Sequence, residues 1–194
     1  MAVENELITE DANPRDRKVF VMRIASCLAT AIAALVMGVN KQTKTVEIGI
    51  DGNGPTRTTL KFQDQSALVF FLISCVGASM HNLTIILTDV YRKRFKPYDK
   101  GRYSAMTPIL DMMNVAGVSA ANAGATLMVV LAMDGNSHLG WNKICDEFGK
   151  YCSYNMVAIA ASYIGLTLLQ VITVFSILKL RTKPKPNDIL AIPP

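Results

Sequence analysis

Four long apolar stretches constrain the fold of this 194-residue sequence more than any other feature. They cover residues 19–39, 66–88, 107–133 and 156–178, and contain 21, 23, 27 and 23 residues. A helix needs about 20 predominantly apolar residues to cross the hydrocarbon core of a bilayer, so each stretch is long enough to span a membrane. The sequence therefore predicts an all-α membrane protein built as a bundle of four transmembrane helices.

The polar segments between these stretches are short and hold almost all of the charged residues. Charged residues make up 18% of the chain, whereas soluble domains carry roughly a quarter. No polar segment is long enough for a second domain of ordinary size. We therefore expect one membrane domain over residues 19–180, between disordered tails at residues 1–18 and 181–194. This organisation excludes a soluble enzyme, a DNA-binding protein and a secreted disulfide scaffold.

The lysines and arginines indicate how the chain is oriented in the membrane. Thirteen of the twenty lie in the N-terminal tail, in the loop between the second and third stretches and in the C-terminal tail, against six in the other two loops. Loops on the cytoplasmic side carry an excess of basic residues, so both termini are predicted to be cytoplasmic. The same distribution accounts for the net charge of +5. No nucleic-acid partner is predicted.

The cytoplasmic loop after the second stretch is short and strongly basic. Its simplest interpretation is a topology signal that also contacts anionic lipid headgroups. A specific phosphoinositide site is the narrower alternative. The predicted contact residues are Arg92, Lys93, Arg94 and Lys96.

The first outside loop, residues 40–65, has two β-prone runs around a glycine-rich turn. The runs cover residues 45–50 and 58–62, and the turn between them reads DGNGP. This pattern predicts a small β-hairpin. Isolated hairpins are marginally stable, so we expect it to lie on the outer membrane face against the second outside loop.

Small residues recur at every fourth position in three of the stretches. They form the rows Ala25, Ala29 and Ala33; Ala116, Ala120 and Gly124; Gly117, Ala121 and Ala125; and Ala161 with Gly165. Small residues at this spacing let membrane helices approach each other closely. The rows favour tight helix packing, but they do not distinguish packing within one chain from self-association.

Two charged residues lie inside the apolar stretches, where each costs roughly 2.5–3.5 kcal/mol on insertion scales. Arg23 is the fifth residue of the first stretch and Asp111 the fifth of the third. Both stretches start at the cytoplasmic face, so both residues lie about 6 Å below the same surface. Arg23 alone could snorkel to the interface, but the Asp111 side chain is too short to do so. Opposite charges at equal depth favour an ion pair between the two helices.

His81 and Asn82, in the second stretch, are the next most polar residues within the predicted spans. His81 lies about 10 Å from the cytoplasmic surface, counted at 1.5 Å per residue. We interpret it as a neutral imidazole hydrogen-bonded within the bundle, with a proton relay as the alternative. The sequence lacks a nucleophile elbow, a P-loop and a metalloprotease motif, so it predicts neither an enzyme nor a cofactor.

Two of the four cysteines, Cys145 and Cys152, lie in the second outside loop, which faces an oxidising compartment. A disulfide between them needs Cα atoms within about 7 Å of each other, which their separation allows. Compartment and spacing favour a small disulfide-closed loop. Two free thiols, or a metal pair with His138, are the alternatives. No metal is predicted, because a metal site needs more ligands than His138 adds.

The same loop carries a motif that resembles a known family. It reads GNSHLGWNKIC over residues 135–145 and FGKYC over residues 148–152. This motif is similar to that of the plant Casparian strip membrane domain protein-like (CASP-like) family, and residues 36–45 are similar to its subgroup one. The residues assigned to this extracellular loop motif are His138, Gly140, Trp141, Phe148 and Gly149.

The resemblance implies a multi-pass plasma-membrane scaffold, distantly related to MARVEL-domain proteins, with an arginine in the first span and an aspartate in the third. Arg23 and Asp111 occupy these places. It also implies partners: copies of the chain itself, related family members and extracellular wall proteins. Members that build Casparian strips have an aromatic-rich first outside loop, whereas Phe62 is the sole aromatic residue within positions 46–65 here. We therefore expect a scaffold at another membrane domain or wall site.

Other functions fit the sequence less well. Claudins need a cysteine pair in the first outside loop, and tetraspanins need a cysteine-rich second loop that opens with Cys-Cys-Gly; neither pattern is present. The rival from another class is a small transporter or channel in which Arg23, Asp111 and His81 line a path. Discontinuous helices would favour transport, but none of the four stretches has an interior proline.

Overall fold

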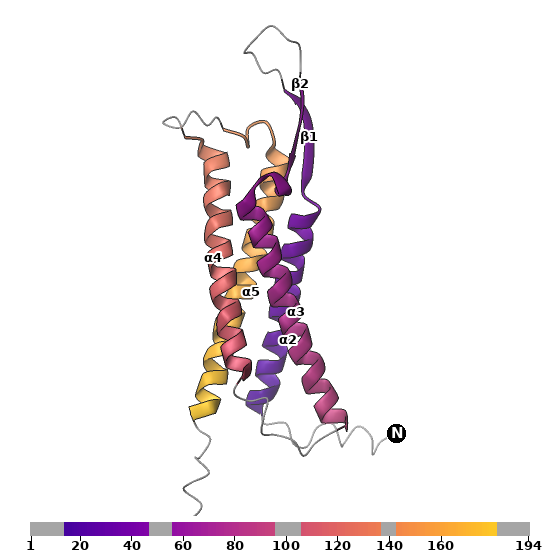
Figure 1. Ribbon diagram of the computed structural model, residues 1–194, viewed down its shortest axis with the longest axis vertical. Coiled ribbons are helices and arrows are strands. Elements are labelled where there is room, and N and C mark those ends of the chain that lie inside the picture. Colours follow the sequence, from indigo (N-terminus) through magenta and orange to yellow (C-terminus); the bar gives the residue numbers. More distant parts are fainter. Residues whose placement is uncertain (1–13, 47–55, 96–105, 137–142, 182–194) are drawn as a thin grey trace, which may run out of the picture.

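The computed structural model describes residues 14–46, 56–95, 106–136 and 143–181. Its main elements are the helices α2 (Pro14–Gly38), α3 (Ser66–Phe95), α4 (Met106–Asp134) and α5 (Gly149–Arg181). Figure 1 shows these helices side by side along the long axis of the molecule. Each contains a segment long and apolar enough to cross a membrane. The four-span helical fold predicted from the sequence is confirmed.

The helices form a ring in which each packs on two neighbours. Both α2 and α4 pack chiefly on α3 and α5, so α2 and α4 lie diagonally across the bundle, as do α3 and α5. Consecutive helices run in opposite directions (Figure 1). We call the end that carries the β-strands the hairpin end, and the end where α2 begins and α5 finishes the terminal end.

Three of the helices extend well beyond the apolar stretches that predicted them. α2 begins at Pro14, so residues 14–18, which we expected in a disordered tail, are helical. α3 continues to Phe95, and α5 begins at Gly149 instead of residue 156. Hydropathy marks only the part of a helix that contacts hydrocarbon, whereas the backbone hydrogen bonds continue into the aqueous region. Proline is also favoured at the first position of a helix, which suits the start of α2.

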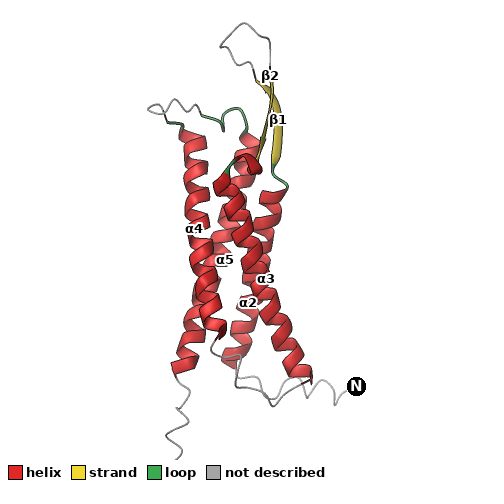
Figure 2. Cartoon of the chain, viewed as in Figure 1, coloured by secondary structure: helices red, strands yellow, loops and turns green. Residues whose placement is uncertain are grey.

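The first outside loop forms the predicted hairpin, with shifted strands. β1 (Lys41–Val46) pairs antiparallel with β2 (Thr56–Lys61), and Lys41 lies opposite Lys61. β1 thus begins four residues before the predicted run, because pairing continues down to the helix ends. Figure 2 shows the strands rising from the bundle instead of lying flat on its end, so the expected orientation is wrong. β1 contacts α5, and a short 3₁₀ turn leads from β2 into α3.

The apolar side chains divide between a narrow core and a broad outer surface. The larger core cluster lies toward the hairpin end and includes Met37, Phe71 and Ile159, and a smaller one lies around Val118 and Leu169. Large apolar side chains are exposed along all four helices; Leu35, for example, is 67% exposed. Soluble monomers rarely expose apolar surface on this scale, whereas a membrane protein presents it to lipid.

Small residues bring α2 and α5 into close contact. A Cβ atom added to Gly165 would lie only 2.8 Å from Cγ2 of Thr30. The Ser26 hydroxyl also donates a hydrogen bond of 3.0 Å to the Gly165 carbonyl oxygen. In α4 the two predicted rows separate: Ala121 and Ala125 are buried, whereas Ala116 and Ala120 are exposed. One row therefore packs within the chain, and part of the other faces outward.

A buried intramembrane ion-pair network as the candidate functional site

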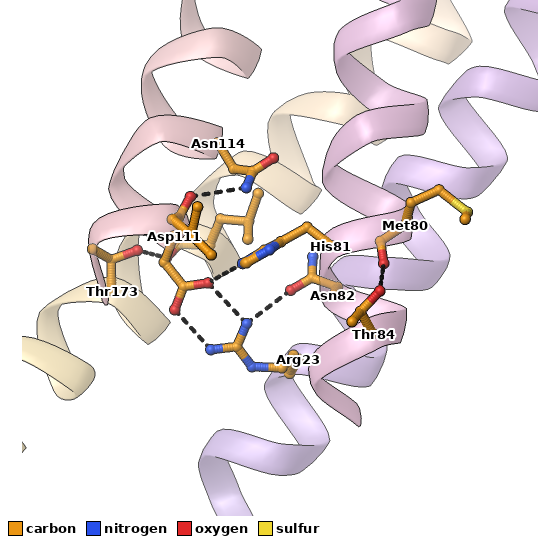
Figure 3. A network of polar contacts seen from close by, with 10 residues as sticks. Arg23, Met80, His81, Asn82, Thr84, Asp111, Asn114 and Thr173 are labelled. Atoms are coloured by element: carbon orange, nitrogen blue, oxygen red, sulfur yellow. Dashed lines mark hydrogen bonds and ion pairs between the residues drawn. The ribbon is translucent and has the colours of Figure 1, made fainter. Parts of the chain in front are cut away.

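The structure brings Arg23 and Asp111 into direct contact. The guanidinium donates two hydrogen bonds to the carboxylate, from Nη1 to Oδ1 at 2.9 Å and from Nη2 to Oδ2 at 2.8 Å (Figure 3). Arg23 is 3% exposed and Asp111 is fully buried. This bidentate geometry is the strongest that an arginine and a carboxylate can form. Because Arg23 lies on α2 and Asp111 on α4, the pair joins two helices across the bundle.

Two residues of α3 complete the network. His81 Nε2 lies 2.8 Å from Asp111 Oδ1, and Arg23 Nη1 donates a hydrogen bond of 3.1 Å to Asn82 Oδ1 (Figure 3). A carboxylate only accepts hydrogen bonds, so Nε2 carries the proton in this contact. The network therefore ties three helices together at one level. Counted along the sequence, His81 lies about 4 Å deeper than the ion pair. Side chains of this length can bridge that difference. The similar depth is therefore the sequence feature that could have predicted this contact.

Two further polar clusters lie nearer the hairpin end, and the sequence predicted neither. In the first, the Ser162 hydroxyl donates to Asn122 Oδ1 at 2.7 Å and lies 3.4 Å from the Cys75 sulfur. In the second, Asn40 Nδ2 donates to Asn155 Oδ1 at 2.6 Å. The first cluster joins α3, α4 and α5, and the second joins the link between α2 and β1 to α5, so each acts as a cross-link inside the bundle. Buried polar groups need such partners, because leaving one unpaired costs about 1–3 kcal/mol.

Apolar side chains lie between these clusters along the bundle. Asp111 and Asn122 are eleven residues apart on α4, which corresponds to about 16 Å. Between these levels lies the smaller core cluster, made of Ala78, Val118, Leu166 and Leu169. Buried polar side chains lie between the same levels as well: Ser26 and Thr30 of α2 are fully buried, and their hydroxyls donate to backbone carbonyl oxygens.

The second outside loop is fastened to the bundle at the hairpin end. Cys145 and Cys152 form a disulfide with their Cα atoms 5.7 Å apart, whereas Cys27 and Cys75 are free thiols. The backbone N–H of Cys145 also donates to the carbonyl oxygen of Ala132, at the end of α4. The described residues contain no group of three potential metal ligands. The loop is therefore held by covalent and backbone bonds.

The other predicted loop-motif residues are only partly described. Phe148 is buried at 5% exposure against the larger core cluster, and Gly149 is the first residue of α5. His138, Gly140 and Trp141 lie outside the described residues. Phe148 thus belongs to the packing that anchors the loop.

Comparison with known proteins identifies the family. A family model described as the Casparian strip membrane protein domain matches residues 13–168. The chain belongs to this family. It is 43% identical over 184 residues to CASP-like protein 1B2 of Populus trichocarpa, covering 93% of this chain and 92% of that protein. CASP-like protein 1B1 of the same species is 44% identical over 187 residues, covering 94% and 95% of the two chains. CASP-like protein 1B2 of Arabidopsis thaliana is 39% identical over 166 residues, covering 84% and 83%.

These matches confirm the resemblance to subgroup one of the CASP-like family. No solved structure matches the chain. This CASP-like protein is a multi-pass membrane protein, and the family belongs to the plasma membrane. The ion pair therefore lies within the membrane-spanning part of the bundle.

Two small cavities lie in the described part of the bundle. One of about 50 Å³ lies under the second outside loop, lined by Asp64, Tyr151 and Asn155 among others. A second, of about 190 Å³, is an open groove between α3 and α4 beside Gly77 and Gly117. Pockets for cofactors or drug-sized ligands are usually about 300–1,000 Å³. Neither cavity has the size of a typical active site.

The predicted lipid contacts lie mostly beyond what the structure describes. Arg94, in the last turn of α3, is exposed at the terminal end. Arg92 and Lys93 belong to the same helix, but their side chains, like Lys96, lie outside the described residues. Contact with anionic lipid thus stays a prediction.

Proposed function

We propose that this CASP-like protein is a non-enzymatic plasma-membrane scaffold, which associates with itself and with related proteins and organises cell-wall-related partners outside the cell. The observation that carries this proposal is that the buried charges Arg23 and Asp111 are matched to each other inside the bundle. The two charges neutralise each other and hold α2 and α4 together. The outward surface of the bundle then remains for contacts with lipid and protein.

In this function the hairpin end faces the cell wall and both termini face the cytoplasm, as the distribution of basic residues predicts. The disulfide-closed loop and the β-hairpin then stand at the wall side as a docking platform. Arg94 and its basic neighbours lie at the cytoplasmic side, where anionic headgroups attract them. In this proposal the wall-side loops bind extracellular partners, and the basic cytoplasmic end binds anionic lipid.

The rival function is transport along a path lined by Arg23, Asp111 and His81. Such a path would have to pass the buried apolar cluster around Val118 and Leu169. Many secondary transporters form their substrate sites with broken helices. Here α4 runs unbroken from Met106 to Asp134 past Asp111. These features favour a scaffold over a transporter.

The test is to purify the whole chain into lipid nanodiscs and vesicles, and to measure both its mass and its solute flux. The scaffold function predicts particles of several copies, well above the 21.2 kDa monomer, and no ion flux above that of empty vesicles. A monomer at every protein density would refute self-association. Ion flux that Asp111→Asn abolishes would instead establish transport.

A further inference from the structure

One face of α5 carries polar side chains toward the lipid. Tyr163, Thr167 and Gln170 are exposed and follow each other at intervals of four and three residues, which places them on one side of the helix. The stretch that contains them, residues 156–178, has its middle near residue 167. These side chains therefore lie close to the middle of the bilayer, where water does not reach.

Two of these side chains find hydrogen-bond partners within the chain. The Thr167 hydroxyl donates to the Tyr163 carbonyl oxygen at 2.9 Å. The Tyr163 hydroxyl lies 3.3 Å from the Thr126 hydroxyl on α4. Gln170 differs, because the described part of the chain offers its carboxamide no hydrogen-bond partner. It is the polar group on this face that needs a partner from outside the chain.

Lipid cannot supply that partner. Gln170 is three residues, or about 4.5 Å, from the middle of its apolar stretch. The headgroups then lie about 10 Å away, beyond the reach of a glutamine, given a half-thickness of about 15 Å. Acyl chains neither donate nor accept hydrogen bonds. A polar group left unpaired in hydrocarbon is strongly unfavourable, so membrane helices bring such groups together.

We propose that Gln170 is the centre of the self-association surface, where it pairs with Gln170 of a second copy of this chain. Copies inserted with the same topology place Gln170 at the same depth, and a two-fold axis along the membrane normal brings identical faces together. A carboxamide has both a donor and an acceptor, so two glutamines bond reciprocally. The proposal deepens the scaffold function and rests on its self-association.

The bundle offers a matched control position. Met80 on α3 is 58% exposed and, like Gln170, lies three residues toward the terminal end from the middle of its stretch. α3 and α5 lie diagonally across the bundle. Both positions are thus exposed and lie at the same counted depth, on helices at opposite corners of the bundle. The native thiols are less accessible, since Cys75 is buried and Cys27 half-buried.

The experiment reconstitutes the whole chain in lipid vesicles, cross-links it with a membrane-permeant oxidant, and measures association by energy transfer between labelled copies. Gln170→Cys should form a disulfide-linked dimer far faster than Met80→Cys. Gln170→Leu should weaken association roughly 3- to 20-fold, the range for interhelical hydrogen bonds in membranes. Thr84→Val, which removes an exposed hydroxyl bonded to its own helix, should leave association unchanged.

Four results would overturn the assignment. Equal cross-linking at both positions, or wild-type association of Gln170→Leu, would show that copies meet through another face while self-association stands. If Gln170→Cys instead cross-linked to a different protein in plant membranes, that protein and not a second copy would be the partner of Gln170. A wild-type chain that stays monomeric at every density would remove the scaffold function itself. Unchanged thermal unfolding of Gln170→Leu excludes a folding defect as the cause of weaker association.

Discussion

Removing Asp111 should damage the bundle more than removing Arg23. The variant Asp111→Leu removes both carboxylate hydrogen bonds of the guanidinium. It leaves a cation that is 3% exposed and whose one remaining hydrogen bond to a described residue goes to Asn82 Oδ1. Removing one partner of a buried ion pair typically costs about 3–5 kcal/mol. Arg23→Met leaves the Asp111 carboxylate bonded to His81, and the carboxyl group can also take up a proton. Arginine has no such escape, since it is not deprotonated in proteins.

The assay is reversible unfolding of the whole chain in mixed micelles, which gives a free energy for each variant. We expect the largest loss for Asp111→Leu, a smaller one for Arg23→Met, and a partial recovery in the double variant, which leaves no unpaired charge. Asn114→Leu is the control, because its amide bonds to Leu110 of its own helix, and it should cost less than about 1 kcal/mol. A double variant no more stable than Asp111→Leu, or a larger loss for Arg23→Met, would refute this reasoning.

Three further predictions concern the rest of the bundle. Non-reducing mass spectrometry should find Cys145 linked to Cys152, and free thiols at both positions would contradict this disulfide. Replacing both cysteines by serine should lower the free energy of unfolding by about 2–3 kcal/mol for a loop of this length. Gly165→Ala should lower the free energy of unfolding by about 1–3 kcal/mol, because the added methyl group contacts α2. The control Gly117→Ala has open space around it and should be neutral or slightly stabilising. Ser162→Ala should cost about 1–3 kcal/mol by leaving a buried amide oxygen on α4 without its donor; an unchanged melting temperature would rule out that contribution.

The sequence predicted the features that depend on position along the membrane normal. The lengths of the apolar stretches predicted four helices. The equal depths of Arg23 and Asp111 predicted their ion pair, in which Nη2 and Oδ2 lie 2.8 Å apart. Depth is readable because each helical residue advances about 1.5 Å. Rotation around each helix axis is not readable in the same way. Lipid and protein interior are both apolar, so no hydrophobic face marks the inner side of a membrane helix.

That limit explains what the sequence left unseen. Nothing in the pattern showed that Ser162 and Asn122 point inward while Gln170 points outward, since all three are polar residues in apolar stretches. The contact of His81 with Asp111 needed the rotation of α3 as well as its depth. The helix ends at Pro14 and Phe95 were missed for a different reason, because hydropathy stops at the headgroups while the helix continues.

Lateral mobility in the plasma membrane tests the central claim most directly. The whole chain, fused to a fluorescent protein and expressed at its native level in plant cells, would be photobleached within a small membrane area. A self-associating scaffold predicts recovery many times slower than that of a four-span protein which remains monomeric in the same membrane. Recovery as fast as that of the monomeric protein would contradict the account.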